Sequence, residues 1–233
     1  MSDDDSRTAL AEGTIFSGLD RGELDALLSL AVRKRYKARD VVLKKGDPAL
    51  QIFVIVSGRL KAITAGGEGR RATLSIMGPG EVFGEVAVFD GEPRSATITA
   101  LEPCELLMIQ RNDFVHFLER SPRVAVKLLE VLARRLRRLS ERVEDVTFLE
   151  VPERLAKLLV RLADRFGKNI GSGAVRLELK LAQQELGDLV GATRESVNKQ
   201  LRAWVSEELI EQQDGKIVLL DVPAMRALCE RDP

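Results

Sequence analysis

The sequence predicts an α+β chain with a β-rich roll at the N-terminus, one long helix, and a C-terminal domain of short helices with a hairpin. Three observations predict this class. Short β-prone runs separated by glycine and proline fill residues 41–109, an apolar heptad pattern follows Pro122, and two helical segments flank a tight turn near residue 191. With 233 residues, 45% of them hydrophobic, the chain is long enough to bury two cores of domain size.

Composition excludes several classes of protein. Lys+Arg and Asp+Glu both number 36, so binding to nucleic acid would need a local basic surface. Cys104 and Cys229 lie far apart without metal-ligand spacing, which argues against a disulfide framework or a metal site and favours a reducing compartment. The chain starts Met1-Ser2-Asp3-Asp4-Asp5, acidic where a signal peptide is basic, and no apolar run approaches the roughly 18 residues of a membrane span. We therefore expect a cytoplasmic protein with no membrane partner.

The first predicted domain is residues 1–121. Residues 19–32 carry apolar side chains at helical spacing (Leu24, Leu27, Leu28 and Val32), with Asp20 as N-cap. Short strands are predicted at 41–43, 52–56, 60–64, 72–76, 95–100 and 106–109. Turn signals roughly every 8–12 residues are typical of an antiparallel roll, similar to a jelly roll.

A long helix is predicted for residues 122–149, with Pro122 in its first turn. Its apolar residues alternate in steps of four and three, which is the heptad pattern of a coiled coil: Ala125, Leu129, Leu132, Leu136, Leu139, Val143 and Val146. Charged residues, Arg135 among them, are expected to keep the other faces in water. The pattern favours pairing with a second copy of the chain, although a helix packed on its own chain would show a similar stripe.

The third predicted domain is residues 150–233, and a hinge that contains Pro152 is expected where it begins, at residues 148–152. A helix is expected at 154–166, a loop at 167–173 and a strand at 175–179. Residues 182–189 and 194–205 then read as two helices around the turn 191–193, the spacing of a helix-turn-helix. Residues 209–219 place Asp214-Gly215 between two short strands, a hairpin that would form a wing.

The second helix of this motif carries a set of polar residues suited to reading DNA. Thr193 can cap the helix, and the core between the two helices is expected to hold Leu186, Val190, Val197 and Leu201. The outward-facing residues are then Arg194, Glu195, Asn198 and Lys199. Guanidinium pairs with guanine, carboxylate accepts from cytosine, and lysine reaches guanine or phosphate. The alternative is an αα-hairpin with an ordinary charged surface.

One turn region of the β-rich domain combines a glycine, a carboxylate and an arginine. Gly84 allows close approach of backbone to a ligand, Glu85 can accept hydrogen bonds from ribose, and Arg94 can neutralise phosphate. These groups together suit a sugar phosphate. Glu85 and Arg94 could instead be a structural ion pair across a hairpin.

The motifs at 184–187 and 190–197, with the wing, resemble the cyclic-AMP receptor protein and FNR family of transcription regulators, and the resemblance extends from about Ile15 to Leu219. It implies that Arg194 and Glu195 read bases, that Thr193 and Ser196 contact phosphate, and that Lys199 replaces a base-reading arginine. Because lysine lacks the rigid guanidinium fork, we expect a palindromic operator resembling TGTGA half-sites, with weaker discrimination opposite Lys199.

Residues 80–97 resemble the phosphate-binding cassette of cyclic-nucleotide-binding domains. The resemblance implies that ribose and cyclic phosphate bind Gly84, Glu85, Val86, Arg94, Ser95 and Ala96. The Thr-Ser pair that presents hydroxyls to adenine in cyclic-AMP-responsive relatives is here Leu139-Ser140. Ser140 could still reach a base from a partner subunit, whereas Leu139 can neither donate nor accept a hydrogen bond. Cyclic AMP is the first expectation, and cyclic GMP, another ligand, a vestigial pocket or activity without ligand are the alternatives.

The remaining function classes are less well supported. The N-terminal cysteine cluster of oxygen-sensing relatives is absent, and His116, the one histidine, is expected to be a surface or packing residue. Nothing in the sequence assigns a catalytic residue, so an enzyme is not expected. A regulatory subunit that docks a protein is a rival, which Arg194 and Glu195 argue against. The expected partners are double-stranded DNA, a cyclic nucleotide, a second copy and, for an activator, RNA polymerase, with the nucleotide acting by shifting the dimer between two arrangements.

Overall fold

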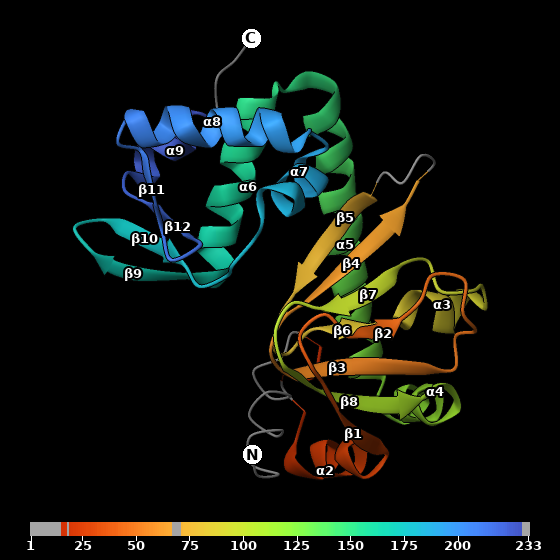
Figure 1. Ribbon diagram of the computed structural model, residues 1–233. Coiled ribbons are helices and arrows are strands. Elements are labelled where there is room, and N and C mark those ends of the chain that lie inside the picture. Colours follow the sequence, from red (N-terminus) through yellow and green to blue (C-terminus); the bar gives the residue numbers. More distant parts are fainter. Residues whose placement is uncertain (1–14, 18, 67–70, 230–233) are drawn as a thin grey trace. The chain divides into compact units, whose positions relative to one another are not determined.

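The computed structural model describes residues 15–17, 19–66 and 71–229 (Figure 1). The chain divides into two compact units, residues 1–137 and 138–233. The division falls within the helix α5 (Pro122–Phe148). The acidic start of the chain, Met1–Asp5, lies outside the described residues.

The N-terminal unit contains two four-stranded antiparallel sheets. One sheet has the strand order β1-β8-β3-β6 and the other β2-β7-β4-β5 (Figure 1). The strands of this unit are β1 (Ala31–Tyr36), β2 (Val41–Leu43), β3 (Gln51–Ser57), β4 (Leu60–Ala65), β5 (Arg71–Met77), β6 (Val82–Phe83), β7 (Thr97–Ala100) and β8 (Cys104–Gln110). Its helices are α2 (Arg21–Ser29), α3 (Glu85–Asp90), α4 (Arg111–Arg120) and the first part of α5.

Strand β3 is buried on both faces because it lies between two apolar layers. Phe53 and Ile55 face a core shared with the second sheet, where the rings of Phe53 and Phe83 stack with centroids 5.1 Å apart. Ile52 and Val54 face a second core, formed with α2, α4 and the start of α5. The unit is therefore built as sheet, sheet and helices, with successive β3 residues alternating between the two cores.

The first helix begins where it was predicted, but it ends three residues earlier than predicted. Asp20 caps α2 through a bond to the backbone N–H of Glu23 (2.8 Å), as predicted. The helix ends at Ser29, and Val32 lies in β1, where its side chain is 50% exposed. Strand β1 was missed because three consecutive charged residues, 33–35, remove any alternating apolar pattern, and the strand forms by pairing with the distant β8. The helix α4 and the short α3 were also missed.

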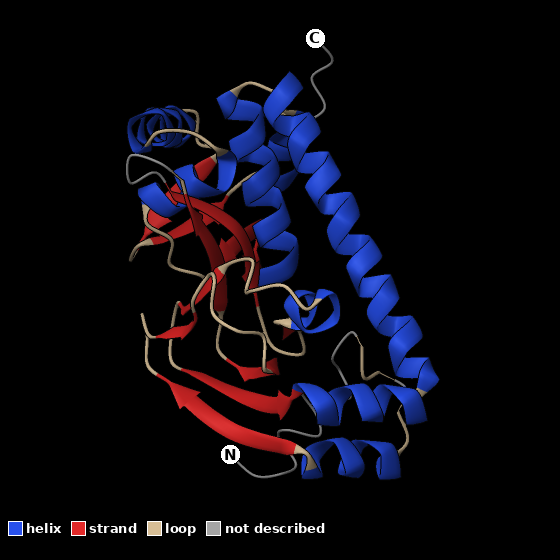
Figure 2. Ribbon diagram, turned by 90° about the vertical axis from the view of Figure 1, so that its right-hand side faces the viewer, coloured by secondary structure: helices blue, strands red, loops and turns tan. Residues whose placement is uncertain are grey.

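Helix α5 begins at Pro122, as predicted, and continues unbroken to Phe148 (Figure 2). Two residues of the heptad stripe, Ala125 and Leu132, pack against the core of the N-terminal unit. The other five are 51–67% exposed: Leu129, Leu136, Leu139, Val143 and Val146. An exposed apolar row of this length on one helix is unusual for a monomer surface and indicates a contact face.

Within its described residues, the C-terminal unit combines four helices that follow α5 with a small antiparallel sheet of order β11-β12-β10-β9. The elements are α6 (Val151–Phe166), β9 (Gly167–Gly171), β10 (Ala174–Leu177), α7 (Gln183–Val190), α8 (Arg194–Ser206), β11 (Ile210–Gln213), β12 (Lys216–Leu219) and α9 (Val222–Ala227). The expected loop at 167–173 is wrong, because its first five residues form β9 and pair with β10. The three glycines of this segment concealed the strand, since glycine carries little β-propensity.

Candidate functional site

Gly84 brings the backbone close to the guanidinium of Arg94 in the N-terminal unit. The residue has φ of +85°, and a Cβ at this position would lie 2.8 Å from Nη1 of Arg94. Both the left-handed conformation and the contact exclude a larger side chain. Glycine is thus required where α3 begins, directly before Glu85.

Arg94 is a buried cation held by carbonyl groups. The whole residue is 3% exposed, and its guanidinium donates to the carbonyl oxygens of Gly84 (2.8 Å) and Gln51 (2.6 Å). Its Nε has no hydrogen-bond partner among the described residues. Burial lowers the pKa of Arg94, while the charges of Glu85 and Asp47 oppose that shift. The geometry keeps a positive charge inside the unit, and the two carbonyl oxygens use two of the five N–H donors of the guanidinium.

Glu85, also buried at 1% exposure, forms its ion pair with Arg135 of α5. Arg135 donates through Nη1 to Oε1 of Glu85 and through Nη2 to the carbonyl of Val82. No local pattern in the sequence indicates this contact, because the two residues lie far apart in the chain. The expectation that Arg135 faces only water is wrong. A carboxylate has about four acceptor positions, so Arg135 leaves capacity for hydroxyl donors.

The other expected pocket residues differ in exposure. Val86 is 45% exposed, Ser95 is exposed and Ala96 is half-buried. Leu139 and Ser140 belong to the C-terminal unit, where both are exposed. The structure therefore brings Gly84, Glu85 and Arg94 together within one unit, and it adds Arg135 to them.

The helix-turn-helix forms as its sequence predicts. Gly191 ends α7 with φ of +70°, and the Thr193 hydroxyl accepts from the backbone N–H of Ser196 (3.1 Å) to start α8. The four residues expected between the helices are each at most 5% exposed: Leu186, Val190, Val197 and Leu201. The motif is therefore a rigid unit with its polar face outward.

That outward face holds a hollow of 440 Å³ lined by Thr193, Arg194, Glu195 and Asn198. Arg194, Glu195 and Lys199 are exposed, as predicted, and the hydroxyls of Ser196 and Thr193 are hydrogen-bonded to each other (2.9 Å). Asn198 differs from expectation, because it is only half-exposed and accepts a hydrogen bond from Gln183 of α7 (3.1 Å).

The wing is held by a carboxylate that the sequence analysis missed. Asp214 and Gly215 have φ of +51° and +76° and close the hairpin of β11 and β12. Glu178 accepts from Lys216 at the start of β12 and from Arg176 of β10 (2.7 Å). Hydrogen bonds from Lys216 and then Arg176 lower the pKa of Glu178 to about 2. The hairpin and the neighbouring strand are thus joined by one charge cluster.

A half-buried arginine joins the last turns of α5 to α7 within the C-terminal unit. Arg142 donates to the carbonyl of Leu189 (2.7 Å), in the last turn of α7, where a cation is favoured by the helix dipole. Burial, followed by the charge of Arg161, lowers the pKa of Arg142, whereas Asp145 raises it. Asp145, 6% exposed, pairs in turn with Lys157 of α6.

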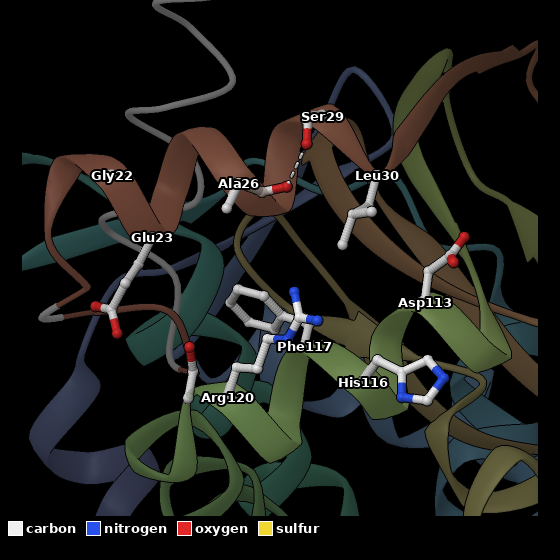
Figure 3. A pocket seen from close by; sticks show the side chains of 10 residues that line it. Gly22, Glu23, Ala26, Ser29, Leu30, Asp113, His116, Phe117 and Arg120 are labelled. Carbon is white, nitrogen blue, oxygen red and sulfur yellow. Dashed lines mark hydrogen bonds between the residues drawn. The ribbon is translucent and has the colours of Figure 1, made fainter.

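A second hollow, of 610 Å³, lies between α2 and α4 (Figure 3). Ala26 of α2 and Leu30, directly after that helix, line one side, and Phe117, His116 and Arg120 line it from α4. His116 is exposed and lies 3.0 Å from Glu119, as expected of a surface residue. Glu85 and Arg94 are not among the residues that line this hollow.

Comparison with known proteins identifies both units. Residues 33–121 match the cyclic nucleotide-binding domain family and residues 153–228 match the Crp-like helix-turn-helix domain family. Among the described residues, no helix is long and apolar enough to cross a membrane.

The chain is 36% identical over 216 residues to the CRP-like cAMP-activated global transcriptional regulator of Mycobacterium tuberculosis, covering 91% of this chain and 93% of that protein. It is 32% identical to the cyclic AMP receptor protein of Thermus thermophilus, covering 87% and 90% of the two chains. The solved structure of the c-di-GMP responsive global regulator CLP of Xanthomonas campestris is similar, with a TM-score of 0.76, 26% identity and coverage of 87% and 100%.

The fold and these matches define a transcription regulator that joins a cyclic-nucleotide-binding domain to a DNA-binding winged helix. The chain belongs to the CRP/FNR family of transcription regulators, which are not enzymes. The predicted fold class and family are confirmed.

Proposed function

We propose that this protein is a homodimeric, cytoplasmic transcription regulator that responds to cyclic AMP and binds palindromic DNA with half-sites resembling TGTGA. The main support for the ligand proposal is that Glu85 and Arg94, two buried groups of opposite charge, both lie beside Gly84. Arg94 offers a guanidinium to a cyclic phosphate, and Glu85 offers acceptors to a ribose hydroxyl. The relatives named as cAMP-activated or as cyclic AMP receptor proteins support the choice of nucleotide.

Val86, Ser95 and Ala96 would complete the phosphate and ribose contacts. Ser140 of a partner subunit would contact the base, and Leu139 would contribute only apolar contact. Two nucleotides in a dimer would favour one arrangement of the paired α5 helices and so set the spacing of the two α8 helices. In an activator, the DNA-bound dimer would then recruit RNA polymerase.

Isothermal titration calorimetry of the full chain with cyclic AMP, cyclic GMP and c-di-GMP tests the ligand. We expect cyclic AMP to bind and Arg94→Leu to abolish binding, because an apolar side chain cannot neutralise phosphate. Arg111→Leu is the matched control, since Arg111 donates to the Val88 carbonyl (2.8 Å) without belonging to the proposed pocket. Absence of heat with all three nucleotides would overturn the ligand proposal.

A second candidate is a regulator that binds DNA without ligand. Leu139 favours it, because an apolar residue in the exposed heptad stripe would stabilise pairing of α5 whether or not a nucleotide is present. Operator binding measured with and without cyclic AMP separates the two. Equal affinity in both conditions supports ligand-independent activity, and an increase with nucleotide supports the first proposal.

DNA binding is proposed to use Arg194 and Glu195 for bases, Lys199 for a base or phosphate, and Thr193 and Ser196 for phosphate. A base-by-base scan of the operator with Arg194→Ala tests this assignment. The variant should lose discrimination at one base pair of each half-site, and an unchanged base preference would count against the assignment.

A further inference from the structure

The amide of Asn198 is oriented by a residue outside the DNA-reading helix. Gln183 occupies the first turn of α7, and its Nε2 donates to Oδ1 of Asn198 in the second turn of α8 (3.1 Å). Both side chains are half-buried, and the helices that carry them are joined by the apolar contacts of the helix-turn-helix core. The bond therefore joins two rigid helices, and with Gln183 as donor it keeps Oδ1 of Asn198 on the side of α7.

The polarity of this bond determines which group Asn198 has left for a ligand. Its carbonyl oxygen is turned to α7 by the bond, so the amino group, with two N–H donors, is the group left over. Asn198 also lines the hollow on the outward face of the motif, one helical turn beyond Arg194. The donors of Asn198 and of Arg194 thus lie along the same side of α8.

An asparagine that is not held in this way reads adenine with both ends of its amide, accepting from N6 and donating to N7. That pairing needs Oδ1 directed at the base. The bond from Gln183 uses one of the two lone pairs of Oδ1 and keeps this oxygen on the side of α7, so the amino group is the end of Asn198 that can face a base. The major-groove acceptors for an amino group are O6 and N7 of guanine and O4 of thymine, besides N7 of adenine without its N6 contact.

We propose that Gln183 is a specificity-determining positioning residue, which holds Asn198 as a donor and so selects guanine or thymine at the base that Asn198 faces. The proposal rests on the DNA-binding role of the family and not on the TGTGA operator. The operator for the test is accordingly obtained by selecting the wild-type protein's binding sites from random duplex DNA.

The experiment measures the affinity of the full-length protein for every single-base variant of the selected operator, by fluorescence anisotropy at one salt concentration. Asn198→Ala identifies the base pair that Asn198 reads, where we expect about a tenfold loss of discrimination. Gln183→Met, which keeps the length of the side chain but cannot donate, should lose discrimination at that same base pair. Gln184→Met is the matched control, because Gln184 bonds Asp188 within α7 (2.8 Å) and should leave the base pair unchanged.

Gln183→Glu makes the stronger test, because a carboxylate can only accept. Asn198 must then turn to donate its amino group to Glu, and its carbonyl oxygen becomes the outward group. The preference at that base pair should move from guanine or thymine to adenine or cytosine, which present N6 or N4 donors. Overall affinity should also fall for all sequences, since the new charge repels phosphate.

Thermal melting of each variant checks that it is folded, and the two Gln183 variants differ enough that one can replace the other if it melts early. The proposal is overturned if Asn198→Ala changes no base preference. It is also overturned if both Gln183 variants keep the wild-type preference at the base pair that Asn198→Ala affects. A failure to select any operator would instead contradict DNA binding itself.

Discussion

Arg135→Met should destabilise the N-terminal unit, because it removes the cationic partner of a buried carboxylate. The Glu85 side chain is 2% exposed and the Arg135 side chain 28% exposed. Breaking a fully buried ion pair costs about 3–5 kcal/mol. Because water reaches part of Arg135, we expect a loss of about 2 kcal/mol of unfolding free energy, which is less than for a fully buried pair.

For a chain of this size, about 2 kcal/mol corresponds to a decrease in Tm of roughly 4–8 °C. Differential scanning calorimetry at pH 7, without nucleotide and at one protein concentration, measures it. Arg134→Met is the matched control, because Arg134 is the preceding residue and its ion pair with Glu130 (3.7 Å) is on the surface. Its loss should change the unfolding free energy by about 0.5 kcal/mol or less.

The double variant Glu85→Gln with Arg135→Met gives the decisive comparison. Removing the buried negative charge together with its partner should recover part of the lost Tm, because an amide is less costly to bury than an unpaired carboxylate. If Arg135→Met melts at the same temperature as Arg134→Met, the pair with Glu85 contributes nothing and the reasoning is refuted. If the double variant is no more stable than Arg135→Met, the cost does not come from the unpaired charge.

Three further predictions follow from other contacts. Leu129→Glu should weaken self-association at least about 100-fold, because it places a charge in the heptad stripe of α5 in both copies. Light scattering after gel filtration should then show a monomer. The control Arg134→Glu should remain dimeric. Gly84→Ala should abolish nucleotide binding by displacing the Arg94 guanidinium, which calorimetric titration measures, and retained affinity would contradict the close approach. The lowered pKa of Glu178 means that its contribution to stability is present above pH 4.5 and is lost as pH falls toward 2. Acid unfolding curves should therefore show a smaller loss of unfolding free energy over that interval for Glu178→Gln than for the wild type. Parallel curves would rule out the cluster.

Local sequence determined a large part of the fold. Asp20 and Thr193 cap helices through bonds to residues three positions away, and Asp214-Gly215 closes a hairpin between neighbouring strands. The start of α5 at Pro122 and the buried residues between α7 and α8 also follow from spacing along one segment. These features were predictable because the interacting groups are adjacent in the chain, so that propensity and periodicity carry the signal.

The sequence also indicated the chemistry of the candidate site, since Gly84, Glu85 and Arg94 lie within one short region. What it could not indicate was the partner of each charge. Arg135 has the same spacing and composition around it as the exposed Arg134, and only the packing of α5 on the sheets brings it to Glu85. The strand β1 likewise depends on pairing with β8, which is distant in sequence.

By itself, then, the sequence determined the class of protein and the order of its three parts, and it predicted the residue types that are proposed to face DNA and nucleotide. Tertiary structure alone decided that Arg135 neutralises Glu85, that Glu178 joins the wing to β10, and that Gln183 donates a hydrogen bond to the amide oxygen of Asn198. The physical reason is that a hydrogen bond or ion pair depends on distance and direction between atoms. Those quantities are set by how whole elements pack, which no pattern along a single segment records.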